Sequence, residues 1–432
     1  MIGGFIDLKE KLQKLTQHKF FRAILTLFSG SLIGQLVSVA SSLFTSRLFT
    51  DYEIGIYTLM TTAVTLFSSI ACLKYEPSIV VAEDDDEAYD LLNLCFTLCG
   101  GTTLVFAVGF SIYLWCKPEI WASAGVFSLL TIGVFFLTGI NDIMYNYNTR
   151  FQNYGLLSKA YAWSSTVKYS MQIVLGYFGL STDGMKVSSL TGTALGTYFH
   201  MHYLWGQRAR VQLRGKEARR RMWRAAVKYR RQPLLAAPAF FVQTASFQVL
   251  NFLIEMLYGF ATFGIYSLAS RMLNVPITLL GNNVARTLFF KNAAEEYNTT
   301  GGYRKSLLLT TAVLAAIAIP MVIILCLLSP WLFATFFGEA WRLSGVYAIY
   351  QAPMYGVRLI VQPLTQALVI CRKQSIELFI QAAFLVCSAV AFIYCQLTGA
   401  PMETFLILIS VSYSLFYLVL YGAIFYFGKK RA

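Results

Sequence analysis

The sequence predicts an all-α integral membrane protein with about 12 transmembrane helices in two six-helix bundles. Its 432 residues are 57% hydrophobic and only 13% charged, with a mean hydropathy of +0.58, whereas soluble domains carry about 25% charged residues. Apolar runs of membrane-spanning length recur from one end of the chain to the other. A long basic stretch divides these runs into six and six. A chain this apolar needs lipid as its solvent.

The predicted elements follow in chain order. Residues 1–21 are charged and predict a cytoplasmic amphipathic arm, and the apolar stretch behind them lacks a small-residue cleavage site, so we expect a retained first span. The expected parts are an N-terminal bundle at 22–206, a basic cytoplasmic linker at 207–233, a C-terminal bundle at 234–427 and a cytoplasmic tail at 428–432. The twelve expected spans are 22–47, 54–82, 90–115, 121–146, 157–179, 186–206, 234–257, 264–289, 306–328, 344–370, 375–396 and 403–427.

The distribution of basic residues predicts the orientation. Of 35 lysines and arginines, 26 fall on the side of both termini, and four fall on the other side: Arg47, Lys117, Lys186 and Arg342. This bias places both termini in the cytoplasm and accounts for the net charge of +14 without nucleic acid. The acidic run "EDDDEA" (83–88) opposes the pattern, but carboxylates contribute little to it. The basic linker is expected to be an orientation signal, with binding of anionic lipid or a partner enzyme as alternatives.

Several classes of site find no support in the sequence. The eight cysteines lie in or next to apolar runs without a CxxC motif, which is typical of packing residues and predicts neither disulfides nor a metal site. The histidines, His18, His200 and His202, fall near the cytoplasmic interface, and no P-loop or GxSxG motif occurs. We therefore expect no cofactor, no metal and no enzymatic activity.

An internal repeat supports the division into halves. The phrase "IGIYTLM" (54–60) matches "FGIYSLA" (263–269) at a constant offset of 209, which aligns Gly55 with Gly264 and Tyr57 with Tyr266. Like-oriented halves are typical of transporters that bind substrate between their two bundles.

Charged residues inside the expected spans are the main functional signal, because each costs about 2.5–3.5 kcal/mol at mid-bilayer. Arg271 lies seven residues beyond Gly264, about 10 Å below the outer end of its span. Arg358 and Lys168 lie near the middle of theirs. Lys74 and Glu76 fall in the inner half of the second span, close to Pro77, while Arg47 and Arg286 lie near span ends.

Cations outnumber carboxylates in these spans, so we expect a shared watery cavity that selects anions. Phosphate or pyrophosphate suits arginine, whose forked donors match oxyanion geometry. The candidate substrate-binding residues are Arg271, Arg358, Lys168, Lys74 and Arg47, and the candidates for ion coupling are Glu76, Asp142 and Glu255. Nearby aromatic residues that could stack on sugars are Tyr75, Tyr161, Trp163, Tyr169 and Tyr355, although membrane-interface belts or packing are the simpler explanation.

Longer stretches carry a resemblance. "FSGSLIGQLVSVASSLFTSRLFTDYEIGIYTLM", "KYEPSIVVAEDDDEAYDLLNL", "FGIYSLASRMLNVPITLLGNNVARTLFFKNAAE" and "WLFATFFGEAWRLSGVYAIYQAPMY" resemble bacterial lipid-linked oligosaccharide flippases of O-antigen and capsule pathways. These form the polysaccharide biosynthesis branch of the multidrug/oligosaccharidyl-lipid/polysaccharide (MOP, MATE-like) exporter superfamily. The resemblance implies a V-shaped two-bundle fold with a cationic cavity. The matching positions are Arg47, Glu76, Arg271, Glu339 and Trp341, while Lys168 and Arg358 match no motif.

The expected function is translocation of an undecaprenyl-pyrophosphate-linked oligosaccharide from the inner to the outer leaflet of the bacterial cytoplasmic membrane by alternating access. Expected partners are this substrate, membrane lipids, and the polymerase and chain-length regulator of the same pathway. A drug or metabolite exporter of the same superfamily is the alternative, although a cationic drug requires an acidic cavity. A polysaccharide polymerase or O-acyltransferase fits less well, because the outer loops are short and no buried catalytic histidine is found.

Overall fold

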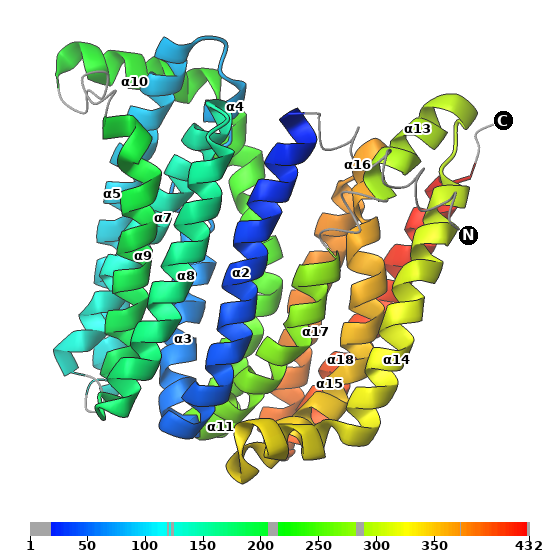
Figure 1. Ribbon diagram of the computed structural model, residues 1–432. Helices are drawn as coiled ribbons and strands as arrows, with labels where there is room; N and C mark the ends of the chain where they lie inside the picture. The colour runs from blue at the N-terminus through cyan, green and yellow to red at the C-terminus, as the bar shows by residue number, and fades with distance from the viewer. Residues whose placement is uncertain are drawn as a thin grey trace, which may run out of the picture. The chain divides into compact units, whose positions relative to one another are not determined.

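The computed structural model describes residues 19–118, 121, 125–205, 215–281, 289–371 and 373–429, and the secondary structure within these ranges is helical (Figure 1). Most of the expected N-terminal arm, the first part of the basic linker, Arg286 and the end of the tail lie outside the described residues. The prediction of an all-α chain is confirmed.

Within the described residues, every expected span is mostly helical. Five helical stretches of the described residues are long and apolar enough to cross a membrane: 85–116, 232–279, 304–337, 375–398 and 402–427. In chain order the principal helices are α2 (Lys19–Leu48), α3 (Asp51–Ser68), α4 (Ser78–Val81), α5 (Asp85–Cys116), α7 (Leu130–Arg150), α8 (Tyr154–Tyr177), α9 (Ser181–Trp205), α10 (Lys216–Lys228), α11 (Ala237–Pro276), α13 (Lys291–Thr300), α14 (Arg304–Phe337), α15 (Arg342–Leu364), α16 (Gln366–Ile370), α17 (Ser375–Thr398) and α18 (Met402–Phe427).

The second expected span, 54–82, is not one helix. Helix α3 ends at Ser68, and helix resumes only at Ser78 with the four-residue α4. In between, Leu73 and Lys74 have left-handed backbone conformations with φ of 49° and 60°. Pro77 contributes to the interruption because its ring lacks an N–H donor and clashes with the preceding turn. The break falls at the charged residues of this span.

Helix α11 covers most of the span expected at 234–257 and the first half of the span expected at 264–289, and it is kinked between them. Gly259 has φ 79° and ψ 175°, a conformation outside the helical range that glycine adopts without a side-chain clash. Subtracting the repeat offset of 209 from this position gives Thr50, which lies in the turn between α2 and α3. In the internal repeat, the kink at Gly259 is therefore equivalent to the turn between α2 and α3.

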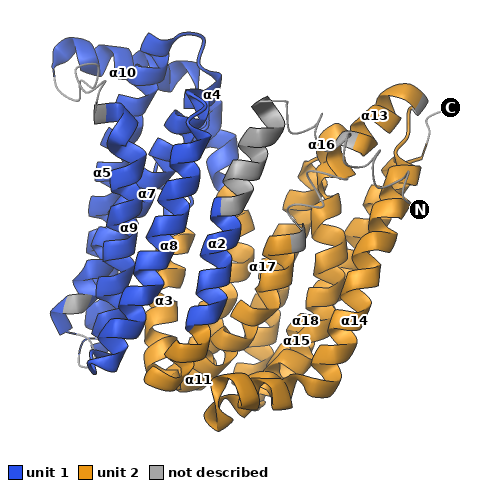
Figure 2. Ribbon diagram, viewed as in Figure 1, with its two compact units in different colours: residues 1–41, 67–238 blue, residues 42–66, 239–432 orange. Residues whose placement is uncertain are grey.

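The chain forms two compact units, residues 1–41 with 67–238 and residues 42–66 with 239–432 (Figure 2). In unit 1, α9 packs against α7 and α8, and α5 packs against α7 and α10. In unit 2, α15 packs against α14 and α18, and α17 packs against α18. The contacts group 42–66 with the C-terminal part of the chain, and the expected division into bundles at 22–206 and 234–427 stays a prediction.

Within unit 2, α3 and α11 cross at the two repeat phrases. A Cβ atom at Gly55 would collide with the carbonyl oxygen of Phe260, and one at Gly264 would collide with the carbonyl oxygen of Asp51. One turn further on, Thr58 Oγ1 donates to Ser267 Oγ at 3.4 Å. Asp51 and Phe260, Gly55 and Gly264, and Thr58 and Ser267 are all related by the offset of 209. The contact is thus reciprocal, as expected where equivalent elements of a repeat meet.

Candidate substrate site

Arg358 is the best-defined candidate and lies in the second half of α15 in unit 2. Its Nε donates to Gln362 Oε1 at 2.7 Å, and its Cζ lies 4.2 Å from the ring centre of Phe247 and 5.7 Å from that of Tyr355. Within the described parts of the chain, no carboxylate forms an ion pair with Arg358, and its terminal nitrogens donate no hydrogen bond. Gln362 and Phe247 fix the plane of the guanidinium, and the two terminal nitrogens, Nη1 and Nη2, remain available to donate to an anion.

A polar seam joins α11 to α15 beside Arg358. Ser270 Oγ donates to Gln351 Oε1 at 3.0 Å, and Asn274 Nδ2 donates to the Tyr355 hydroxyl at 3.2 Å. Polar side chains that bond across helices are typical of membrane interiors that bury function. We call Ser270, Asn274, Gln351 and Tyr355 the α11–α15 seam.

Arg271 and Arg358 both lie at the α11–α15 seam. Arg271 follows Ser270 directly, and Arg358 comes one helical turn after Tyr355. Arg271 is half-buried, and no carboxylate in the described ranges pairs with it. Unit 2 therefore contains two arginines at membrane depth whose charges the described side chains leave unmatched.

Arg47 lies at the end of α2, also in unit 2, and is exposed. Its Nη2 donates a long hydrogen bond of 3.4 Å to the Phe336 carbonyl. The neighbouring "FGEAW" motif has a structural task, because the buried Trp341 donates from Nε1 to the Ser46 carbonyl at 2.6 Å. The Trp341 side chain of this motif therefore links the end of α2 to the turn between α14 and α15 by a hydrogen bond.

In unit 1, the break after α3 brings Lys74 and Glu76 together. Lys74 Nζ lies 3.1 Å from Glu76 Oε1, and Glu76 is only 5% exposed. Residues two apart do not face each other on a straight helix, but the chain is not helical here. Among the described atoms, Glu76 Oε2 is buried without a hydrogen-bond partner. Asp142 of α7 lies within electrostatic range of both charges.

The charge of Lys74 is thus already matched, unlike that of Arg271 or Arg358. Its role as a substrate ligand stays a prediction. Glu255, another acidic candidate, is buried in α11 of unit 2.

Lys168 is half-buried on α8, where that helix packs closely on α9 at Gly192. Its Nζ lies 5.5 Å from the ring centre of Tyr169, whose hydroxyl accepts a 2.8 Å hydrogen bond from Ser38. Lys168 and Lys74 therefore belong to unit 1, whereas the three candidate arginines belong to unit 2. A single cavity that contains all five residues stays a prediction.

The expected aromatic residues fall into two groups. Tyr75 and Tyr355 are buried, and their hydroxyls bond to the Ala226 carbonyl and to Asn274. Tyr161 and Trp163 on α8 are 52% and 54% exposed, so their rings remain available for contact with a substrate or with lipid.

The sequence reasoning missed Phe247 and Gln362, which hold Arg358. Gln362 is four residues further on the same helix, a spacing at which helical side chains meet, so it could have been found. Phe247 comes from α11, more than a hundred residues away, and only the fold brings it to Arg358.

A family model described as polysaccharide biosynthesis protein matches residues 44–345. The chain belongs to the polysaccharide biosynthesis protein family. The matched region contains the break after α3, the kink at Gly259 and the "FGEAW" motif, so the resemblance inferred from the sequence is confirmed. No curated protein sequence matches this family member significantly.

Solved structures of transporters share its fold. A lipid II flippase, MurJ, in an inward closed conformation superimposes with a TM-score of 0.72 at 13% identity, covering 92% of this chain and 87% of that one. An inward-facing multidrug resistance MATE family transporter of the MOP superfamily gives 0.66 at 13% identity, covering 93% and 97%. A MOP superfamily transporter from Pyrococcus furiosus, described as having a binding pocket of reverse polarity, gives 0.63 at 14% identity, covering 94% and 95%.

This polysaccharide biosynthesis protein is therefore a multi-pass membrane protein with the MOP transporter fold. The solved structures that share this fold are those of transporters, in agreement with the expectation that the protein is not an enzyme.

Proposed function

We propose that this protein is a flippase that moves an undecaprenyl-pyrophosphate-linked oligosaccharide from the inner to the outer leaflet of the bacterial cytoplasmic membrane. The observation that carries the proposal is the pair Arg271 and Arg358, whose charges no carboxylate in the described ranges matches, beside the polar α11–α15 seam. The family supports a substrate from polysaccharide biosynthesis. The fold of a lipid II flippase supports a lipid-linked one.

The chemistry of the two arginines suits a diphosphate. Each guanidinium offers paired donors that match two phosphate oxygens. Stacking on Phe247 and the hydrogen bond to Gln362 hold the Arg358 fork in one plane, which lowers the entropy lost when an anion binds. The hydroxyl and amide groups of the α11–α15 seam supply hydrogen-bond partners for sugar rings.

Flipping needs no bond to change, only a polar path through hydrocarbon. Carrying two negative charges outward across an inside-negative membrane gains about 4.6 kcal/mol per 100 mV, at about 2.3 kcal/mol per charge. The membrane potential therefore favours the complete transport cycle in the outward direction. An empty cationic site is driven inward by the same field.

The test is a leaflet-accessibility assay in proteoliposomes containing fluorescent undecaprenyl-pyrophosphate-linked oligosaccharide. Arg358→Ala and Arg271→Ala should each slow transfer by about tenfold to a hundredfold, because a hydrogen bond to a charged group contributes about 1.5–3 kcal/mol. Arg→Lys at either position should recover only part of the rate, because lysine lacks the planar fork.

Arg304→Ala is the matched control. Arg304 is the first residue of α14, and its Cζ lies 4.1 Å from the ring centre of Phe425, so its stacking geometry resembles that of Arg358 but it lies at a helix end. The control should transport normally. Normal transport in both the Arg271 and Arg358 alanine variants would refute the proposal.

The acidic pair near the break after α3 is our candidate for ion coupling. Glu76 forms an ion pair with Lys74, Asp142 lies within electrostatic range of both charges, and Glu76 retains a buried oxygen without a described partner. Glu76→Gln should leave transport at zero proton gradient unchanged and abolish its acceleration by a gradient. Equal acceleration in the wild type and the variant would exclude this role. Glu255→Gln provides the same comparison in unit 2.

We further propose that both termini and the basic linker face the cytoplasm, and that the polymerase and chain-length regulator of the same pathway receive the flipped product. The first point rests on the distribution of basic residues. Labelling of single cysteines introduced at Lys429 and Lys117 with a membrane-impermeant reagent tests it: only the second should react in intact cells.

A further inference from the structure

The basic helix α10 presents two different faces. Its inner face carries Ala218, Met222 and Ala225, which are buried against α5 in unit 1, where Met222 Sδ accepts a hydrogen bond from Thr97 Oγ1 at 3.7 Å. Figure 1 shows α10 lying across the end of α5 rather than alongside it. The helix is therefore docked on the bundle by small and apolar side chains.

The acidic run 83–88 and Asp90 hold α10 in place by charge. Arg221 Nε lies 3.1 Å from Asp90 Oδ1, and Lys228 Nζ lies 3.0 Å from Glu83 Oε1 and forms a second ion pair with Glu87. Hydrogen bonds to these two glutamates raise the pKa of Lys228.

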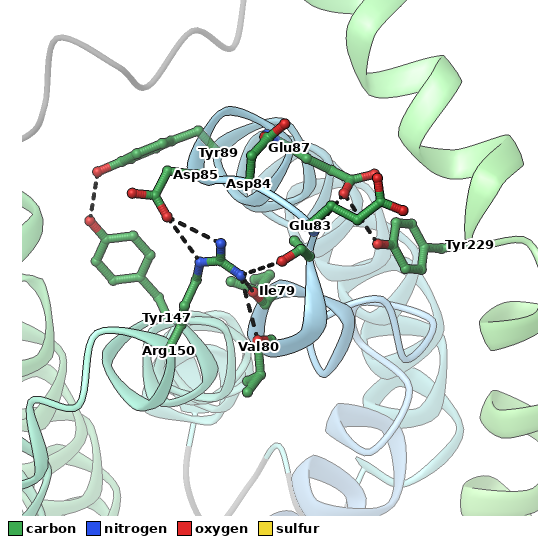
Figure 3. A network of polar contacts seen from close by, with 11 residues as sticks. Ile79, Val80, Glu83, Asp84, Asp85, Glu87, Tyr89, Tyr147, Arg150 and Tyr229 are labelled. Atoms are coloured by element: carbon green, nitrogen blue, oxygen red, sulfur yellow. Dashed lines mark hydrogen bonds and ion pairs between the residues drawn. The ribbon is translucent and has the colours of Figure 1, made fainter.

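Arg150 of α7 also binds this acidic turn (Figure 3). It donates to Asp85 Oδ1 at 3.1 Å and to the Ala82 carbonyl at 2.8 Å. The acidic segment that opposed the positive-inside pattern is thus the docking surface for basic residues of the same unit.

The outer face of α10 carries three basic residues that take no part in these ion pairs. Arg219, Arg220 and Arg224 are exposed and form no ion pair with any carboxylate in the described ranges. Between them lies Trp223, 71% exposed, with Val227 one turn further on, 46% exposed. We call these five residues the outer face of α10.

The depth of α10 is that of lipid headgroups. Its partner Asp90 lies five residues into α5, at the position where the expected span begins, and α5 continues with exposed Leu104, Val105 and Val108. Trp is enriched at the membrane–water boundary, and arginine donates to phosphate in pairs. Exposed arginines around a tryptophan at this depth complement the charge of a phospholipid surface.

We propose that the outer face of α10 binds the headgroups of anionic phospholipids, which on the expected topology belong to the inner leaflet. The bound lipid is structural or regulatory and distinct from the transported substrate, because α10 lies at the end of the unit 1 bundle (Figure 1), within the expected linker and outside the expected spans. The proposal is independent of the flippase assignment.

Native mass spectrometry of the full chain released from detergent micelles tests this, with phosphatidylglycerol and phosphatidylcholine of identical acyl chains and no lipid-linked oligosaccharide. A basic residue near an anionic surface strengthens attachment about fivefold. The triple variant R219Q/R220Q/R224Q should therefore lose the preference for phosphatidylglycerol by at least about tenfold, and R219K/R220K/R224K should keep most of it.

The matched control is K305Q/K373Q/K429Q, which removes three exposed basic residues from unit 2 and the same total charge. It should retain the preference of the wild type. An unchanged preference in the arginine triple variant would overturn the proposal and favour a protein partner on this face. An equal loss in the control would also overturn it, because net charge alone would then explain the binding.

Discussion

The crossing of α3 and α11 makes the sharpest prediction, because alanine at either glycine should force two helices apart. A Cβ atom at Gly55 or Gly264 would lie well inside the 3.0 Å that real Cβ contacts respect, and the opposing atom is in each case a backbone carbonyl oxygen that cannot rotate away. Small residues at such crossings let membrane helices approach closely.

The magnitude follows from the displacement. The helices must separate by about 1 Å, and a gap of that size forfeits up to about half of the dispersion attraction between facing atoms. Overpacking of this kind costs about 1–3 kcal/mol. The Thr58–Ser267 hydrogen bond, already 3.4 Å long, should break as well. Because the contact is reciprocal, Gly55→Ala and Gly264→Ala should have similar effects.

The double variant separates this explanation from simple helix strain. Once one alanine has moved the helices apart, the second meets much less resistance, so the two losses should sum to clearly more than the loss in the double variant. Gly109→Ala on α5 is the matched control, because no atom lies within 4 Å of its Cβ position. That change should stabilise by about 0.5–1 kcal/mol, because alanine restricts the unfolded chain.

The assay is thermal unfolding of purified protein in one detergent, followed by the transport rate in proteoliposomes. Equal melting temperatures for Gly55→Ala and Gly109→Ala would refute the close crossing. Strict additivity in the double variant would refute the reciprocal contact.

Two further predictions concern other parts of unit 2. Trp341→Phe should lower stability by about 1–3 kcal/mol, because the buried Ser46 carbonyl loses its donor, whereas Trp331→Phe, at an exposed position, should leave the melting temperature unchanged. Burial raises the pKa of Glu296, but hydrogen bonds from Ser306 and from two N–H groups in the first turn of α14 outweigh it, so its pKa lies below its ordinary value. A lowered folded-state pKa stabilises the protein above the unfolded value of about 4.3, and this stabilisation is lost as the pH falls through the folded-state pKa. The protection of the two amides, corrected for the intrinsic exchange rate at each pH, should therefore fall in acid in the wild type and show no such step in Glu296→Gln.

The sequence determined the fold class and the approximate positions of the long helices, because the length of a hydrophobic run is a local property of the sequence that decides whether a segment can span a bilayer. It also indicated the repeat, since Gly55 and Gly264 stand in matching phrases, and it singled out Arg271 and Arg358 by their depth alone.

Only the tertiary structure decided which charges are matched and by what. Lys74 pairs with Glu76 because the chain leaves the helix after Ser68, a break that hydropathy does not register. Phe247 reaches Arg358 across more than a hundred residues. The acidic run 83–88 looked like an exception to the charge pattern until the fold placed it against α10. Pairing depends on distances between segments remote in sequence, and those distances exist only once the helices have packed.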